Sequence, residues 1–267
     1  MIRNLFKFLS ECQNALAPTT PRRQREFSLH METLEPRQML SGNVMAMFTG
    51  GSLVITGDAD HNDLQIQVVE ENLVLVGQND TTINGNADGF VLAENSISFA
   101  GNVIAKLKQG NDRLVIEPGA QIEGSILIFA GDGDDAIGLD DVKIGGKTTI
   151  FAGGGNDSIV SRNSQLQNGM LASGHGDDTI SLQDSQVNGR LKVKSGAGAD
   201  TVVLQNTTVS GHAHLRTGTG DDDLAIQDAT FDKALKSHAG SGDDVTLVRD
   251  SSIGGHSLFL MQTGDDA

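Results

Sequence analysis

Residues 131–137 read Gly-Asp-Gly-Asp-Asp-Ala-Ile, and strings of the same kind return along the chain at a nearly constant interval. When the second glycine of each string is aligned, the successive spacings are 23, 22, 21, 22, 22, 22 and 22 residues. So regular a period predicts a repeat architecture, in which each repeat is one structural unit stacked on the previous one. The aligned starts are Gly110, Gly133, Gly155, Gly176, Gly198, Gly220, Gly242 and Gly264.

Each repeat has the same internal order. Apolar side chains follow the aligned glycine after four and six residues, as in Ile137 and Leu139, and this spacing places both on one face of a strand. A second apolar position follows at eleven residues (Ile144), and a third strand leads to the next glycine pair. The pattern predicts three short strands per coil, and therefore an all-β fold: a right-handed parallel β-helix of about 22 residues per coil.

An Asp or Asn lies eight residues after the aligned glycine in six successive repeats. We interpret this second corner as structural, with the side chains capping backbone groups at a bend. Its members are Asp141, Asn163, Asp184, Asn206, Asp228 and Asp250.

The chain divides into three predicted regions. Residues 1–42 hold three of the four prolines and six of the 19 basic residues, and are predicted to be a disordered leader or export segment. Residues 43–107 contain strand-like segments without the repeat period, and are predicted to form a β-rich N-terminal cap over the first coil. Residues 108–267 are predicted to form the coils.

The composition limits the classes of partner. The 267 residues carry a net charge of −16, which argues against nucleic acid and anionic membranes and favours cations. No apolar run approaches the roughly 20 residues of a membrane span. The single cysteine, Cys12, excludes a disulfide framework.

A short motif in the leader suggests export. Residues 31–41 read Met-Glu-Thr-Leu-Glu-Pro-Arg-Gln-Met-Leu-Ser. This stretch resembles the LEPRxLL motif near the start of large exported proteins of planctomycete-type bacteria, with Met39 in place of the first Leu of the usual pair. The resemblance implies that the protein is secreted or bound to the cell surface.

The glycine-rich corners carry a second resemblance. Residues 131–137, 153–159 and 174–180 share the order Gly-x-Gly-x-Asp-x-Ile. They resemble the calcium-binding nonapeptide GGxGxDxUx of RTX (hemolysin-type) repeat proteins. The resemblance implies Ca²⁺ as a cofactor, bound by carbonyl oxygens and by the aspartate of each turn. The implied ligands are Asp112, Asp135, Asp157, Asp178, Asp200, Asp222 and Asp244, with Asp134, Asp177, Asp221 and Asp243 beside them.

This sequence departs from the RTX pattern in two respects. The first glycine of the pair is usually replaced, for example by Ala130, and there is one nonapeptide per coil instead of two. A single calcium column along one edge remains compatible with this. The alternative is a metal-free row of solvated turn residues, although aspartates stacked one coil apart repel one another unless a cation or a proton relieves the repulsion.

A basic strip is predicted on the outward positions of the third strand, and it suggests a different function. It could bind acidic glycans of the cell envelope, and some parallel β-helices are polysaccharide lyases. Uniform repeats without long loops, and the absence of Tyr and Trp, argue against an enzyme. The strip comprises Arg190, Lys192, Lys194, Arg216 and Lys236, with His214 and His238.

These observations predict a non-enzymatic, calcium-binding structural or adhesive protein, with a polyanionic glycan-binding module as the alternative. Residues 264–267 begin a further coil, so we also expect copies to associate end to end, or the array to continue.

Overall fold

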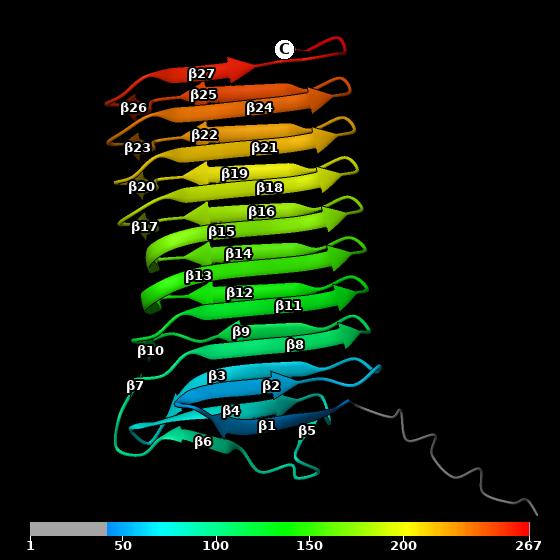
Figure 1. Cartoon of the computed structure of the whole chain (residues 1–267), viewed down its shortest axis with the longest axis vertical. Helices are drawn as coiled ribbons and strands as arrows, with labels where there is room; N and C mark the ends of the chain where they lie inside the picture. The colour runs from blue at the N-terminus through cyan, green and yellow to red at the C-terminus, as the bar shows by residue number, and fades with distance from the viewer. Residues whose placement is uncertain (1–41, 267) are drawn as a thin grey trace, which may run out of the picture. The chain divides into compact units, whose positions relative to one another are not determined.

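The computed structural model describes residues 42–266. The predicted leader therefore lies outside the described residues, except for Gly42. The described part is all-β and forms stacked coils of parallel strands, as the repeat period predicts (Figure 1). Residues 42–266 contain no helix of the length and apolarity needed to cross a membrane.

Each coil contributes three strands, which stack on their equivalents in the neighbouring coils. The first set follows the glycine turn and pairs in register, for example Ile137 with Ile159. It consists of β9 (Arg113–Ile116), β12 (Ala136–Asp140), β14 (Ser158–Arg162), β16 (Thr179–Gln183), β19 (Thr201–Gln205), β22 (Asp223–Gln227) and β25 (Val245–Arg249).

The strands of the second set are short, and those of the third set are long. The two-residue strands are β10 (Gln121–Ile122), β17 (Gln186–Val187), β20 (Thr208–Val209), β23 (Thr230–Phe231) and β26 (Ser252–Ile253). The long strands are β8 (Val103–Gln109), β11 (Ile126–Asp132), β18 (Leu191–Ala197), β21 (Ala213–Thr219), β24 (Leu235–Ser241) and β27 (Ser257–Leu260). In two coils both positions belong to one strand, namely β13 (Lys143–Gly154) and β15 (Gln165–His175).

One coil is a residue shorter than its neighbours. The 21-residue interval lies between Gly155 and Gly176. The pairing of β13 with β15 shifts register between Ile144 and Lys147, at the corner between the second and third strand positions, and is regular on both sides. The length difference is therefore absorbed at this corner, and every column before and after it stays aligned.

The core is a set of columns of apolar side chains along the inside of the stack. In β18, for example, Leu191 and Val193 are buried, whereas Lys192 and Lys194 point outward. Each fully buried Ile, Leu or Val side chain contributes roughly 1.5–3 kcal/mol of transfer free energy. Repetition in every coil produces one continuous core from the N-terminal strands to β24.

The N-terminal region is β-rich, as predicted, but its strands are largely antiparallel. β1 (Asn43–Thr49) pairs antiparallel with β2 (Ser52–Thr56), and β3 (Asp63–Val69) pairs antiparallel with β4 (Asn72–Gln78). The remaining strands are β5 (Thr82–Ile83), β6 (Phe90–Ala93) and β7 (Ser98–Phe99). Because β2 pairs with β8 and β3 with β9, the hairpins continue the sheets of the coils, and the predicted boundary at residue 107 falls inside β8.

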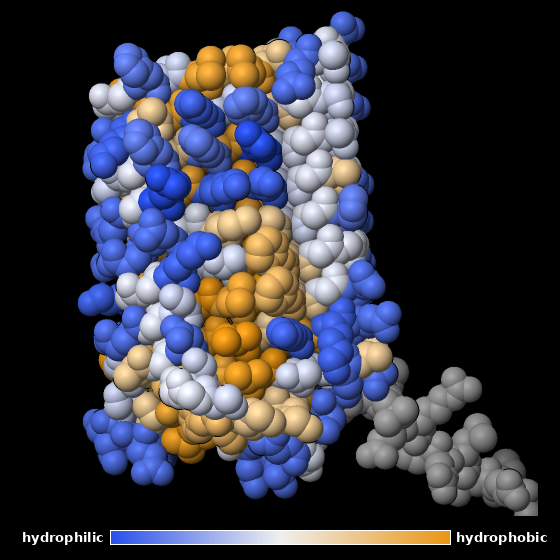
Figure 2. Space-filling model, viewed as in Figure 1, coloured by the Kyte–Doolittle hydropathy of each residue, from blue (hydrophilic) through white to orange (hydrophobic). Residues whose placement is uncertain are grey.

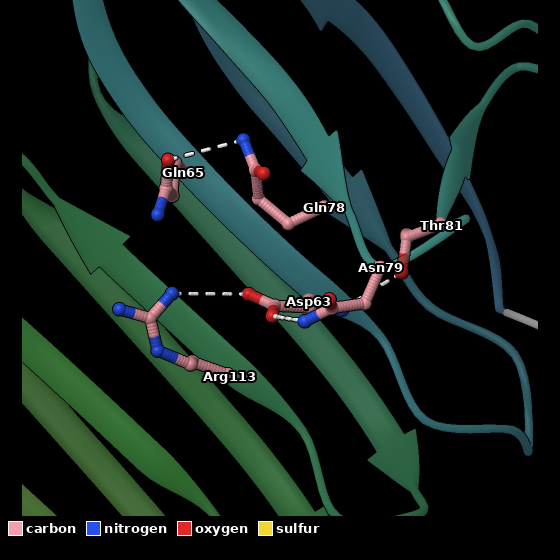
Figure 3. Close-up of polar contacts among 6 residues, drawn as sticks. All are labelled: Asp63, Gln65, Gln78, Asn79, Thr81 and Arg113. Carbon is pink, nitrogen blue, oxygen red and sulfur yellow. Dashed lines mark hydrogen bonds and ion pairs between the residues drawn. The ribbon is translucent and has the colours of Figure 1, made fainter.

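Polar contacts hold the hairpin β3–β4 together, and one of them joins it to the first coil (Figure 3). Asp63 accepts hydrogen bonds from Arg113 of β9 (3.1 Å, an ion pair) and from Asn79 (2.6 Å). Its backbone N–H donates to Thr81 Oγ1 (3.0 Å), and Gln78 donates to Gln65 (3.1 Å). The ion pair of Asp63 with Arg113 thus adds a side-chain contact at a position where β3 and β9 are register partners.

At the other end of the described residues, β25 and β27 have no further described coil stacked on them. The side chain of Val248 is 39% exposed, whereas its partner in the preceding coil, Ile226, is fully buried. The predicted end-to-end association of copies stays a prediction.

Candidate functional site

The turn that precedes the first strand of a coil holds two glycines at positive φ in the turns from Gly131 to Gly242, whereas in the first coil Lys108 takes the earlier position at a φ of +86°. Gly153 has a φ of +127° and Gly176 a φ of +111°, which are conformations that side chains disfavour. Stacking adds a second reason: a Cβ on Gly153 would lie 1.8 Å from the carbonyl oxygen of Gly131, and one on Gly176 would lie 2.2 Å from that of Gly155. The turns therefore stack with backbone directly against backbone, and the residues that follow are held in exact columns.

The aspartate two residues after the aligned glycine points into the stack. Asp135 has the same parity as the buried Ile137 and Leu139, so the alternation of the strand turns all three inward. Seven such residues are only 1–2% exposed, and we call them the inner column. Its members are Asp112, Asp135, Asp157, Asp178, Asp200, Asp222 and Asp244.

Hydrogen bonds to the backbone connect the inner column from coil to coil. The N–H of Asp135 donates to Oδ1 of Asp157 (2.8 Å), and the N–H of Asp157 donates to Oδ1 of Asp178 (2.8 Å). The same bond recurs at every step from Asp112 to Asp244, at 2.7–3.0 Å. One oxygen of each carboxylate therefore accepts a turn N–H of the preceding coil, and this explains why an aspartate is repeated here.

The second oxygen of each inner-column carboxylate, Oδ2, lacks a hydrogen-bond donor. Oδ2 of all seven inner-column aspartates is buried and has no hydrogen-bond partner. Hydroxyl groups of Ser173, Ser195 and Thr217 lie beside Asp178, Asp200 and Asp222 and oppose the rise in pKa of these carboxyls, but each hydroxyl has a single hydrogen and also lies within hydrogen-bond distance of a backbone carbonyl of the next coil. A buried carboxylate oxygen without a donor is unfavourable, so a proton or a cation is needed beside it.

The electrostatic environment is consistent with this shortage of donors. Burial raises the pKa of Asp135 and of Asp157 to about 7, and the backbone hydrogen bond only partly offsets this effect. Burial likewise raises the pKa of Asp112 and of Asp200 to about 6. The pKa values of the remaining three, Asp178, Asp222 and Asp244, are also raised, again chiefly by burial. Without a cation, protons would thus be held by several inner-column carboxyls near neutral pH.

The residue before each inner aspartate forms a separate, exposed row, which we call the outer column. Here the bonds run in the opposite direction along the stack: the N–H of Asn156 donates to Oδ1 of Asp134 (2.8 Å) in the preceding coil. Ala199 interrupts the row, because its side chain has no acceptor. The members are Asn111, Asp134, Asn156, Asp177, Ala199, Asp221 and Asp243. The two neighbouring aspartates of a turn therefore have different surroundings.

The Asx residues of the second corner have a conformational role. All six are in the left-handed region, with φ between +46° and +52°. Asn and Asp enter this region more readily than other non-glycine residues. The structural interpretation of this column is thus supported by backbone conformation, in addition to the capping considered from the sequence.

The residues of the basic strip lie together on the outward face of the long strands. Lys192, His214 and Lys236 are register partners on β18, β21 and β24, and so are Lys194, Arg216 and His238. Arg190 lies just before β18. The side chains predicted to be outward neighbours are therefore brought into two adjacent columns.

One residue that continues the inner column, Asn62, was not predicted from the sequence. The backbone N–H of Asn62 donates to Oδ1 of Asp112 (2.7 Å), and its side-chain amide donates to the same oxygen (2.9 Å). Asn62 is fully buried and extends the column into the cap. It lies 50 residues before Asp112, so the 22-residue period gave no signal for it.

Within residues 42–266, no group of three or more His, Cys, Asp or Glu side chains is placed to hold a metal ion. The inner column instead supplies carboxylates singly, one from each coil. Comparisons with protein-family models, curated proteins and solved structures found no match for this chain.

Proposed function

We propose that this chain is a non-enzymatic structural or adhesive repeat protein, secreted or at the cell surface, in which Ca²⁺ binds along the inner column. The observation that carries the calcium proposal is the unpartnered, buried Oδ2 repeated in seven consecutive coils. The surface location rests on the resemblance of residues 31–41 to an export motif, and those residues lie outside the described part of the chain.

The chemistry of the donors fits a hard cation. Ca²⁺ takes six to eight oxygen ligands and tolerates irregular geometry. Two successive inner aspartates are one coil apart, roughly 4.8 Å along the stack, so both can contribute to the space between them. Because a group of three acidic side chains is not formed among the described residues, the other ligands would be neutral oxygens. A bound Ca²⁺ would neutralise the buried carboxylates and join neighbouring coils.

A proton is the competing partner for Oδ2. The raised pKa values of Asp135 and Asp157 mean that protonation alone could neutralise these sites near pH 7. Calcium and protons then compete, and metal binding should tighten as the pH rises because the ligands must lose their protons. A test at pH 8 separates the two partners, since most of these carboxyls are then ionised.

The decisive measurement is thermal unfolding at pH 8, with chelator or with Ca²⁺. We expect Ca²⁺ to raise the melting temperature markedly, since one site filled at about 100 times its dissociation constant adds about 2.7 kcal/mol. Mg²⁺ should substitute poorly, because it requires a tighter octahedral shell. Identical melting curves with chelator and with Ca²⁺ would refute the calcium proposal.

A matched pair of variants locates the effect. The triple change Asp135→Asn, Asp157→Asn, Asp178→Asn should abolish most of the calcium-dependent shift, because it removes three consecutive inner carboxylates. The control is Asp134→Asn, Asp177→Asn, Asp221→Asn in the outer column, which removes the same charge and should keep the shift. Loss of the shift only in the outer variant would move the calcium site to the surface of the turns.

A further inference from the structure

The basic strip is a concentration of positive charge without counterions on an acidic protein. Within residues 42–266 the ion pairs are Arg113–Asp63 and Arg249–Asp250, and neither involves the strip. The chain as a whole carries a net charge of −16, so the grouping of these cations on one face is not a result of general composition. Within residues 42–266, therefore, no acidic side chain forms an ion pair with the strip.

Stacking makes this arrangement unfavourable in the free protein. Lys194 and Arg216 are direct register partners on β18 and β21, and like charges directly opposite each other destabilise a sheet. Burial, followed by the charges of Lys236, Arg190 and Arg216, lowers the pKa of His214, so the surface is locally positive. An anionic ligand that spans several coils would relieve this repulsion.

A groove runs beside the strip. It has a volume of about 480 Å³, and its charged walls are Lys147, Arg190, Lys192 and Lys233, together with His212. No acidic side chain lines it. The groove and the two outward columns therefore form one concave and one flat part of a single cationic surface.

The same face continues into an apolar area. Figure 2 shows hydrophilic side chains over the long strands just below β27, with hydrophobic side chains below them on the same face and again above them at the top. The apolar part includes Phe129 and Phe151, which are in the same register column as Lys194 and Arg216, with Ala172 between. An extended ligand lying along the stack could thus contact charged and uncharged surface in one line.

We propose that this surface binds a linear polysaccharide bearing carboxylate or sulfate groups, laid along the axis of the stack. Repeated anionic groups match the basic residues of three successive coils, on β18, β21 and β24, and the less polar faces of the sugar rings match the apolar area. Single-stranded nucleic acid is a poorer match, because β18, β21 and β24 contain no Phe, Tyr or Trp on which bases could stack. Phe129 and Phe151 stack on each other (5.2 Å between ring centroids), which occupies one face of each ring.

The test measures binding of the full chain to three polymers that share one backbone: dextran sulfate, carboxymethyl-dextran and uncharged dextran. At low salt we expect the first two to bind and the third not to bind, with affinity falling as salt rises. The two charged polymers distinguish sulfate from carboxylate. Absence of binding to both charged polymers at low salt would overturn the proposal.

Matched variants separate a defined site from general attraction. Lys194→Gln with Arg216→Gln should weaken binding by about tenfold, since each lost contact removes several-fold in affinity. Lys143→Gln with Arg162→Gln removes the same charge from exposed positions outside the strip and should leave the affinity within about twofold. Neither variant should melt below the parent protein, because all four side chains have solvent access, and loss of the Lys194–Arg216 repulsion can only raise the melting temperature of the strip variant. Equal weakening by both pairs would contradict a site at the strip.

Two further results would change the assignment of the ligand or of the function. Binding of an oligothymidylate of equal charge as tightly as dextran sulfate would overturn the polysaccharide class. Appearance of ultraviolet-absorbing unsaturated sugars from polygalacturonate would show a lyase and refute the non-enzymatic function proposed above. The calcium experiment is independent of both, because its readout is stability without any polymer.

Discussion

Alanine at Gly153 should lower the free energy of unfolding by more than about 3 kcal/mol. Two effects add at this position. The backbone is held at a φ of +127°, where an L side chain is strained, and the new Cβ would lie 1.8 Å from the carbonyl oxygen of Gly131. The atom it meets is backbone and belongs to the stacked turn of the preceding coil, so it cannot move without disturbing the hydrogen bonds between coils.

The neighbouring glycine provides the control. At Gly154, the atom nearest to a new Cβ is a side-chain oxygen of Asp132 at 3.8 Å, which is an ordinary contact, and the φ is not in the left-handed region. Gly154→Ala should therefore change stability by no more than about 0.5 kcal/mol. Urea denaturation of both variants, at fixed Ca²⁺, measures the difference. Similar stabilities for the two would show that the stacked turns are looser than the structure indicates.

In the absence of metal, stability should fall as the pH rises from about 4 to about 7 and change little above that range. The folded-state pKa of Asp135 is about 7, higher than the ordinary value of 3.8 expected in the unfolded chain. The folded protein therefore binds more protons than the unfolded chain between these values, and the stabilisation is complete only below the unfolded pKa. The inner column contains seven such carboxyls with raised pKa values, so the melting temperature of chelated protein should be much higher at pH 5 than at pH 8.

Asp135→Asn tests whether the inner column causes this dependence. The amide keeps an oxygen for the N–H of Asp112 but cannot ionise, so the metal-free variant should melt higher than the parent protein at pH 8. Asp134→Asn, at the adjacent exposed position, should retain the pH dependence of the parent. With Ca²⁺ at pH 8 the order should reverse, because the parent gains the metal and the Asp135→Asn variant loses a ligand. A melting temperature of metal-free protein that does not change between pH 5 and pH 8 would contradict protonation of the buried carboxyls.

The fold could be predicted from the sequence because the period and the strand alternation are both local signals. The spacing of the aligned glycines fixes the coil length, and pairs such as Ile137 and Leu139 identify an inward face. The cap was predicted only as β-rich. Its antiparallel hairpins depend on pairings such as β3 with β4 and β3 with β9, which no repeated residue marks.

The sequence marks the aspartates of the inner column by their spacing, but it does not reveal their surroundings. Asp134 and Asp135 look equivalent as a pair of turn carboxylates, and the sequence leaves open whether their column binds Ca²⁺ or is a metal-free, solvated row. Asp135 lies two residues before the inward-facing Ile137, and this spacing alone was enough to predict that the Asp135 side chain points inward. The missing donor at Oδ2 could not have been found in this way, because it depends on how the turn backbone and hydroxyls such as that of Ser195 are already engaged.

The corner between Ile144 and Lys147 shows where this architecture can change length. One coil is one residue shorter there, and the glycine and aspartate columns on the far side are undisturbed. Residues can thus be gained or lost at this corner during evolution without a penalty that spreads to other coils, whereas the glycine turn allows no such variation. The same corner is a natural position for grafting a foreign peptide onto each coil, which would display many copies at a regular spacing along one side of the stack.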